Sequence, residues 1–179
     1  MNIGFDLDKI FINVPPFVPK QFVDFLYKGR FRGPLRYRTP SRIEKIIRIF
    51  SHYPIFRPPI SKNMNYIKSL ALENKNKYYL ISSRFSFLKK NTDALIKRYE
   101  FDKIFDSMHF NILDTQPHKF KNDMIKKLNL DMFVDDDLDL LKFLAHKNYK
   151  IKFFWLNQKE NKLIEENLYA IKNIADIFK

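Results

Sequence analysis

Two groups of aspartates, near opposite ends of the chain, are the residues best suited to chemistry. The first group is Asp6 and Asp8, which follow a short apolar run, and the second is Asp135–Asp137, which follows Met132–Val134. Because ligands of open α/β sheets bind beyond the carboxyl ends of parallel strands, carboxylates that follow two such strands can converge. Converging carboxylates repel one another unless a cation neutralises them, and oxygen-only ligands suit Mg²⁺. The sequence therefore predicts a magnesium site at one edge of a sheet.

Asp6 and Asp8 also have the residue type and spacing for phosphoryl transfer. One carboxylate can attack phosphorus to form an aspartyl-phosphate, while the other protonates the leaving oxygen and later activates water. The alternative is that both are ordinary turn residues, since Asp-x-Asp pairs are common. For Asp135–Asp137 the alternative is acidic capping of a helix that begins there.

Hydroxyl and ammonium groups that could hold a phosphate occur between the two acidic groups. Ser82 ends the apolar run that begins at Tyr78, and its hydroxyl, with the turn at Ser83, can donate hydrogen bonds to an anion. Lys119 and Lys121 lie at the start of a predicted helix, where a cation is unfavourable unless it faces a phosphate. The alternatives are a plain turn serine and exposed lysines.

The elements that must position these residues alternate between apolar runs and amphipathic segments. Strands separated by helices of ten or more residues predict βαβ units and a parallel sheet. Ser41 and Glu44 have the spacing of a capping box at the start of one helix. Strands are expected at 3–7, 78–81, 104–105, 132–134 and 151–156, and helices at 19–28, 41–51, 63–74, 86–99, 119–128, 138–147 and 159–177.

Composition narrows the class of protein. With 179 residues, of which 45% are hydrophobic and 16% aromatic, the chain can form one packed domain. Three glycines exclude glycine-rich phosphate loops, and the lack of cysteine excludes disulfides and thiolate zinc sites. No apolar run approaches the ~18 residues that span a bilayer, and Asp6 and Asp8 interrupt any signal peptide. We expect a cytoplasmic protein without a transmembrane segment.

In their order along the chain, these motifs resemble those of the haloacid dehalogenase-like (HAD) superfamily of phosphotransferases. The family's first motif appears as Phe5–Asp8, the second as Tyr79–Ser82 and the fourth as Phe133–Asp136. Its third motif is a lysine that opens a helix, for which Lys121 has the better spacing and Lys119 is the alternative. The resemblance covers about residues 2–157. It implies an α/β fold, a three-layer Rossmann-like parallel sheet with a small helical cap inserted after the first strand.

The resemblance also implies a role for each matching residue. Asp6 would be the nucleophile and a magnesium ligand, and Asp8 the general acid and base, with its backbone carbonyl offered to the metal. Asp136 would be the likelier direct metal ligand, and Asp135 would bind the metal or orient a bound water. The phosphoryl oxygens would be held by Ser82, Ser83 and Lys121, or Lys119. Family members usually have glycine after the second aspartate, where this chain has Lys9.

The segment after the first motif is strongly basic. The chain carries a net charge of +13, and within residues 28–57 nine basic residues accompany one acidic residue, Glu44. Arginine binds phosphate bidentately, and interleaved aromatic residues could stack on bases. We expect core residues 1–12 and 63–179, and a basic, mainly helical cap over 13–62. The candidate substrate-binding residues of this cap are Arg30, Arg32, Arg36 and Arg38. The alternative is a solvated cap whose aromatic residues pack inward.

The sequence thus favours a Mg²⁺-dependent phosphatase. The expected partner is a phosphorylated small molecule or nucleotide, or a nucleic acid, with nucleotide or nucleic-acid phosphate favoured as substrate. One alternative is a nucleic-acid-binding module that keeps the scaffold without turnover, with Lys9 as the residue that impairs it. The other is a phosphatase of sugar phosphates or other small metabolites, in which the basic segment reflects composition only.

Overall fold

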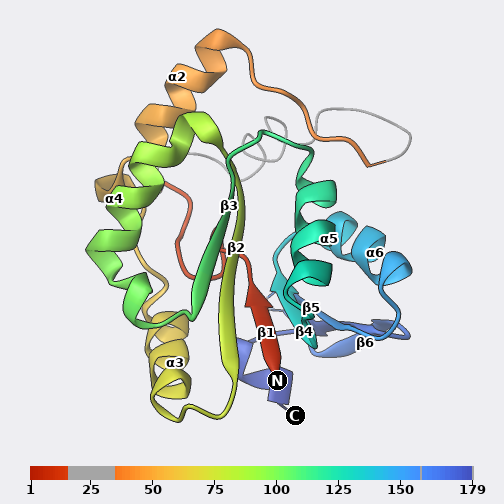
Figure 1. The fold of residues 1–179 in the computed structure, drawn as a ribbon. Coiled ribbons are helices and arrows are strands. Elements are labelled where there is room, and N and C mark those ends of the chain that lie inside the picture. Colours follow the sequence, from red (N-terminus) through yellow and green to blue (C-terminus); the bar gives the residue numbers. More distant parts are fainter. Residues whose placement is uncertain (16–34, 158, 179) are drawn as a thin grey trace.

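The fold is built on one seven-stranded sheet with the strand order β3-β2-β1-β4-β5-β7-β6 (Figure 1). The computed structural model describes residues 1–15, 35–157 and 159–178. Neighbouring strands are parallel except β6, which runs antiparallel to β7. The strands are β1 (Asn2–Phe5), β2 (Lys77–Phe85), β3 (Ser107–Asn111), β4 (Met132–Asp135), β5 (Lys152–Leu156), β6 (Lys162–Glu165) and β7 (Leu168–Ile171). The first strand therefore lies between β2 and β4, and the sequence motifs follow three adjacent strands.

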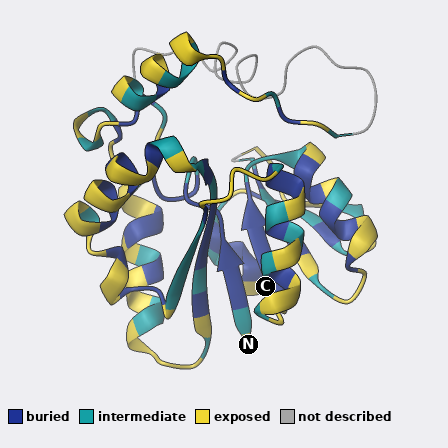
Figure 2. Ribbon diagram, turned by 45° about the horizontal axis from the view of Figure 1, so that its top comes forward, coloured by how far each residue is buried: buried dark blue, intermediate teal, exposed yellow. Residues whose placement is uncertain are grey.

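Helices cover both faces of the sheet. On one face lie α3 (Ser61–Leu72) and α4 (Lys89–Tyr99), and on the other lie α5 (Pro117–Lys127) and α6 (Leu138–Lys147) (Figure 1). Each face has its own apolar core. The buried residues form the dark blue interior of Figure 2. These layers confirm the predicted α/β class with a mostly parallel sheet. Every helix in the described part of the chain is too short or too polar to span a bilayer.

The strand β1 is packed closely on one side. A Cβ atom added at Gly4 would lie 2.5 Å from Leu130 Cδ1 and 2.8 Å from a ring carbon of Phe133. Only glycine leaves room for these side chains, so the sheet and α5–β4 connection approach each other at this point. The strand β1 pairs with β4 here, with Phe5 opposite Val134, and this register places the residues that follow both strands side by side.

The two ends of the segment between β1 and α3 are joined. Ile12 forms an antiparallel bridge with Pro59. The backbone N–H of Asn13 donates to the carbonyl of Pro58 at 2.9 Å, and that of Ile60 donates to Phe11 at 2.7 Å. The chain thus leaves and re-enters the core at one place, as an insertion must. The division of the chain into a core and a 13–62 cap stays a prediction, and the helix expected at 19–28 lies outside the described residues.

The helix α2 (Arg42–Ser51) stands above the carboxyl edge of the sheet, and η1 (Pro54–Phe56) follows it (Figure 1). Its predicted capping box is confirmed: Ser41 Oγ accepts from the backbone N–H of Glu44, whose side chain accepts from the backbone N–H of Ser41. The apolar face of α2 is turned outward, with Ile43 and Ile46 exposed by 71% and 67%. The opposite side places Arg48, 2% exposed, toward the sheet.

The prediction of a strand at residues 104–105 is wrong. Ile104 and Phe105 are buried in the core directly after a 3₁₀ turn, and the strand β3 begins only at Ser107. The reason is Asp106, which pairs with Tyr78 in both directions: its N–H donates to the Tyr78 carbonyl at 2.9 Å, and its carboxylate accepts from the Tyr78 N–H at 2.8 Å. The apolar pair therefore packs into the core before β3 begins and is not part of a strand.

The helix expected at 159–177 is also wrong, because this segment forms the hairpin of β6 and β7 and a terminal 3₁₀ helix, η4 (Ile174–Phe178). The open edge of the apolar strand β5 takes β7 as its parallel neighbour, with Leu168 opposite Phe153. Asn167 anchors the turn by donating to the carbonyls of Asn148 and Ile151 at 3.1 and 3.0 Å. Pairing with an exposed strand edge outweighed a helical spacing of apolar residues.

Candidate active site

A buried lysine joins the two acidic groups at the carboxyl edge of the sheet. Asp6 follows β1 and Asp135 ends β4, which are paired through Phe5 and Val134. From α5, Lys121 Nζ donates to Asp6 Oδ1 at 2.7 Å and to Asp135 Oδ2 at 2.6 Å. All three charged residues are buried. The structure thus brings together residues that are more than a hundred positions apart in the sequence.

Three carboxylates at this edge form a group that could hold a metal ion. Among the described residues, Asp6, Asp135 and Asp136 each offer one carboxylate oxygen, and these atoms lie within 4.8 Å of one another. Burial, together with the charges of neighbouring carboxylates, raises the pKa of Asp6 well above its ordinary value, although Lys121 opposes this. Burial also raises the pKa of Asp136 to about 6, against the effect of Lys9. A close set of oxygen ligands whose ionisation is costly fits a hard divalent cation such as Mg²⁺.

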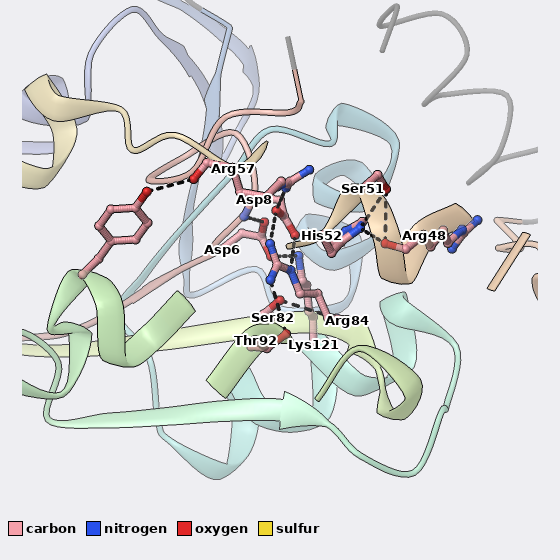
Figure 3. A network of polar contacts seen from close by, with 11 residues as sticks. Asp6, Asp8, Arg48, Ser51, His52, Arg57, Ser82, Arg84, Thr92 and Lys121 are labelled. Carbon is pink, nitrogen blue, oxygen red and sulfur yellow. Dashed lines mark hydrogen bonds and ion pairs between the residues drawn. The ribbon is translucent and has the colours of Figure 1, made fainter. Parts of the chain in front are cut away.

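Asp8 lies beside this group but makes different contacts. Arg84 binds it with two hydrogen bonds, Nε to Oδ2 at 2.8 Å and Nη2 to Oδ1 at 2.7 Å, and Arg57 also donates to Oδ1 (Figure 3). Although burial raises its pKa, Arg84 and Arg57 lower the pKa of Asp8 far below its ordinary value. The carboxylate of Asp8 is not in the group that could hold a metal, so its expected contribution there is limited to the backbone carbonyl.

The candidate phosphate-binding residues differ in where the structure places them. Ser82, at the carboxyl part of β2, is buried, and its hydroxyl accepts a long hydrogen bond of 3.5 Å from the backbone N–H of Arg84. The hydroxyl of Ser83 is buried and has no hydrogen-bond partner among the described residues. Lys119 is exposed on α5, away from the acidic groups, whereas Lys121 lies between them. Of the two lysines, only Lys121 is placed at the site.

A cavity of about 390 Å³ lies between the acidic edge of the sheet and α2. Its volume is that of a small-molecule site. Of the cap arginines, Arg38 lines the cavity, Arg36 is exposed outside it, and Arg30 and Arg32 lie outside the described residues. Further basic residues of the wall are Lys9, Arg48, Arg57 and Arg84.

The aromatic residue Tyr37 ties the segment before α2 to the acidic edge. Its hydroxyl donates to Asp137 Oδ2 at 2.7 Å, and its backbone N–H donates to Gln116 Oε1 at 2.9 Å. Tyr37 also stacks on His118, and burial next to Asp137 raises its pKa. Tyr37 is therefore part of the cavity wall, and its ring is not free to stack on a base.

Sequence reasoning missed Arg48, Arg57 and Arg84 as site residues. Arg84 directly follows Ser82-Ser83, so its place at the end of β2 was a local signal that could have indicated it. For Arg57 the signal is weaker, because only the joining of the insertion's two ends brings it to Asp8. Arg48 belongs to the polar stripe of α2, which the sequence alone could not assign to an inward or outward face.

Buried His52 provides a stability test of the arrangement around Asp8. Its ring Nδ1 lies 2.7 Å from the Arg48 carbonyl, and burial with the charges of Arg84 and Arg57 lowers its pKa well below 6.5 (Figure 3). The unfolded chain takes up a proton below pH 6.5 while the folded chain does not, so stability must fall as pH drops through this window. At pH 5 this loss is at most about 2 kcal/mol.

The variant His52→Gln should therefore lose less stability between pH 7 and pH 5 than the natural chain. The measurement is urea unfolding at both pH values. His146→Gln, at an exposed histidine at the end of α6, is the matched control for the loss of a histidine. Equal pH slopes for His52→Gln and the natural chain would contradict a buried neutral His52.

Comparison with known proteins agrees with this architecture. No protein-family model matches the chain, and neither does any curated protein sequence. A protein assigned as a beta-phosphoglucomutase, from Thermotoga maritima, has 13% sequence identity and a TM-score of 0.62, with 99% of this chain and 97% of that chain covered. The haloacid dehalogenase-like family hydrolase SP0104 from Streptococcus pneumoniae has 12% identity and a TM-score of 0.51, with 87% and 84% covered.

A third similar structure is a chain of the Pnkp1/Rnl/Hen1 RNA repair complex. It has 12% identity and a TM-score of 0.52, and the match covers 87% of this chain but 42% of that one. This chain therefore spans less than half the length of that relative. Sequence identities this low show the fold alone. The chain has the fold of the haloacid dehalogenase-like hydrolases, and its own motif residues lie at the ends of three adjacent parallel strands.

Proposed function

We propose that the protein is a Mg²⁺-dependent phosphatase that hydrolyses a phosphomonoester through an aspartyl-phosphate on Asp6. The observation that carries the proposal is the convergence of Asp6, Asp135 and Asp136 around one point, with Lys121 bound to two of them. A bound Mg²⁺ would neutralise these carboxylates and the phosphate together. Positioning and charge neutralisation supply most of the rate in phosphoryl transfer.

The residues divide the proposed reaction between them. An oxygen of Asp6 attacks phosphorus, the bond to the ester oxygen breaks, and the alcohol leaves with a proton. Water then attacks the aspartyl-phosphate, which releases inorganic phosphate and restores Asp6. The backbone N–H of Asp8 donates to Asp6 Oδ2 at 2.9 Å and orients the nucleophile. The ammonium group of Lys121 neutralises charge on the phosphoryl oxygens. The hydroxyls of Ser82 and Ser83 donate hydrogen bonds to them.

Asp8 is the proposed general acid and base. Its contacts with Arg84 and Arg57 affect which protonation state it can adopt at each step. The ionised form that Arg84 and Arg57 favour is the form that takes a proton from the attacking water. The first step needs the protonated form instead. The substrate phosphate must therefore compete with Asp8 for these two guanidinium groups, which line the same cavity.

We favour a nucleotide or nucleic-acid phosphate as substrate. Four arginines on the cavity wall, Arg38, Arg48, Arg57 and Arg84, support a polyanionic ligand, because guanidinium groups bind phosphate bidentately. The likeness to a chain of an RNA repair complex points the same way. A sugar phosphate is the second candidate, supported by the likeness to the protein assigned as a beta-phosphoglucomutase.

The test is a hydrolysis screen of the full chain against nucleotides, 5′- and 3′-phosphorylated oligonucleotides and sugar phosphates, with Mg²⁺ or with EDTA. We expect phosphate release that EDTA abolishes, with the largest kcat/KM on the nucleotide or oligonucleotide arm. Highest activity on sugar phosphates would instead select the second candidate. Salt-dependent binding of RNA or DNA without hydrolysis on any arm would contradict the enzyme and favour a binding module.

A further inference from the structure

Lys9 occupies a backbone conformation that L side chains rarely adopt. Its φ is +59°, in the left-handed region, and its N–H donates to the Ile12 carbonyl at 2.7 Å to close the turn after Asp8. Glycine is the residue best suited to such a position. Residues held in strained conformations cluster at functional sites. The lysine side chain at this turn therefore needs an explanation from its contacts.

The Lys9 side chain contacts a proposed metal ligand. Its Nζ lies 2.8 Å from Asp136 Oδ2. Lys121 already binds Asp6 and Asp135, so each of the three carboxylates that could hold a cation has an ammonium group beside it. Three carboxylates and two ammonium groups leave a net charge of −1 when all are ionised. Binding of a divalent cation would make the net charge of this group positive. Binding of a phosphate dianion would then make it negative again.

The side chains of Lys9 and Lys121 differ in how far they are exposed. The side chain of Lys121 is 5% exposed, whereas that of Lys9 is 34% exposed and lies on the cavity wall. An ammonium group on a four-carbon stem at an open edge can change partners without repacking the core. The cavity that it borders is the one into which the phosphorylated substrate would enter.

We propose that Lys9 is a built-in counter-cation that competes with Mg²⁺ for Asp136 and passes to the phosphate when substrate binds. This inference rests on the proposed function and adds a property to it: metal and phosphate bind cooperatively, and the site binds Mg²⁺ weakly alone. Phosphate binding draws Lys9 from Asp136, which then becomes fully available as a ligand.

The test is the affinity for Mg²⁺ of Lys9→Met and of the natural chain, measured by titration calorimetry without and with saturating inorganic phosphate. Without phosphate, Lys9→Met should bind Mg²⁺ more tightly by up to about fivefold, the upper end of the range for loss of one partly exposed ion pair. With phosphate the advantage should disappear, because Lys9 has then left Asp136. Lys9→Gly, which suits the left-handed turn, provides a second variant that folds without strain.

Lys142→Met, on an exposed lysine of α6, removes the same charge away from the site and should leave both affinities unchanged. If Lys142→Met gained as much Mg²⁺ affinity as Lys9→Met, the gain would be an effect of net charge alone, and the inference would be overturned. Equal Mg²⁺ affinities of the Lys9 variants and the natural chain would also overturn it, while EDTA-sensitive hydrolysis by the natural chain would keep the proposed function intact. No Mg²⁺ binding by any of these chains would overturn both.

Discussion

Asp6→Asn should lower phosphomonoester turnover by on the order of 10³-fold or more, because an amide oxygen cannot form the acyl-phosphate that the carboxylate forms. The fold should be kept. The variant loses the charge of the ion pair with Lys121 Nζ, 2.7 Å from Asp6 Oδ1, and at most the hydrogen bond from the Asp8 N–H, 2.9 Å long. Lys121 keeps its hydrogen bond to Asp135, and the variant removes a buried carboxylate whose pKa is raised by its surroundings. We expect the free energy of unfolding in EDTA to change by no more than about 1 kcal/mol.

The measurements are the initial rate on the best substrate of the screen and urea unfolding in EDTA. Asp123→Asn, on the exposed side of α5, is the matched control, with one charge fewer and unchanged turnover expected. Retained turnover in Asp6→Asn would reject the nucleophile assignment. Lost turnover with a collapsed transition would show a structural role instead.

The acidic edge of the site was predictable because its signals are local. Asp6 and Asp135 each follow an apolar run that is typical of a buried strand, and neighbouring parallel strands present their carboxyl ends at the same edge. Lys121 was one of two candidates, with Lys119, for the lysine of the third motif that the family resemblance implies. These predictions needed no knowledge of which residues lie across the cavity.

The arginine contacts of Asp8 were not predictable from local signals. Arg84 reaches Asp8 from β2, and Arg57 reaches it only because the chain returns to the core at Pro58–Ile60. The sequence gives no sign that two guanidinium groups share one carboxylate. An ion pair depends on the three-dimensional path of the backbone, whereas the position of a carboxylate after a strand depends on a few neighbouring residues.

The orientation of α2 was not predictable from the sequence, and the fold of the last residues was predicted wrongly, for a related reason. The capping box at Ser41 and the apolar stripe that includes Ile43 correctly indicate a helix, yet the stripe faces outward and Arg48 faces the cavity. Between 159 and 177 the helical spacing of apolar residues was real but lost to strand pairing with β5. Periodicity identifies a face, and only the tertiary structure decides what that face meets.

Lys121→Met should lower the stability of the fold far more than Asp6→Asn. The ammonium group of Lys121 bonds to both Asp6 and Asp135, so its removal leaves two buried carboxylates next to each other without a cation. Although burial lowers its pKa, Asp135 and Asp6 raise the pKa of Lys121 above its ordinary value, so the charged form is the stable one. Removing one partner of a buried ion pair costs about 3–5 kcal/mol.

We therefore expect the free energy of unfolding of Lys121→Met in EDTA at pH 7 to fall by about that amount, measured by urea unfolding. Addition of Mg²⁺ should restore part of the loss, because the ion supplies the missing positive charge and binds only the folded chain.

Lys119→Met is the matched control on the same helix, and because Lys119 is exposed its effect should stay within about 0.5 kcal/mol. In the double variant with Asp6→Asn the loss should shrink, because one uncompensated carboxylate remains where there were two. Equal stability of Lys121→Met and Lys119→Met would mean that the lysine does not hold the two acidic groups together.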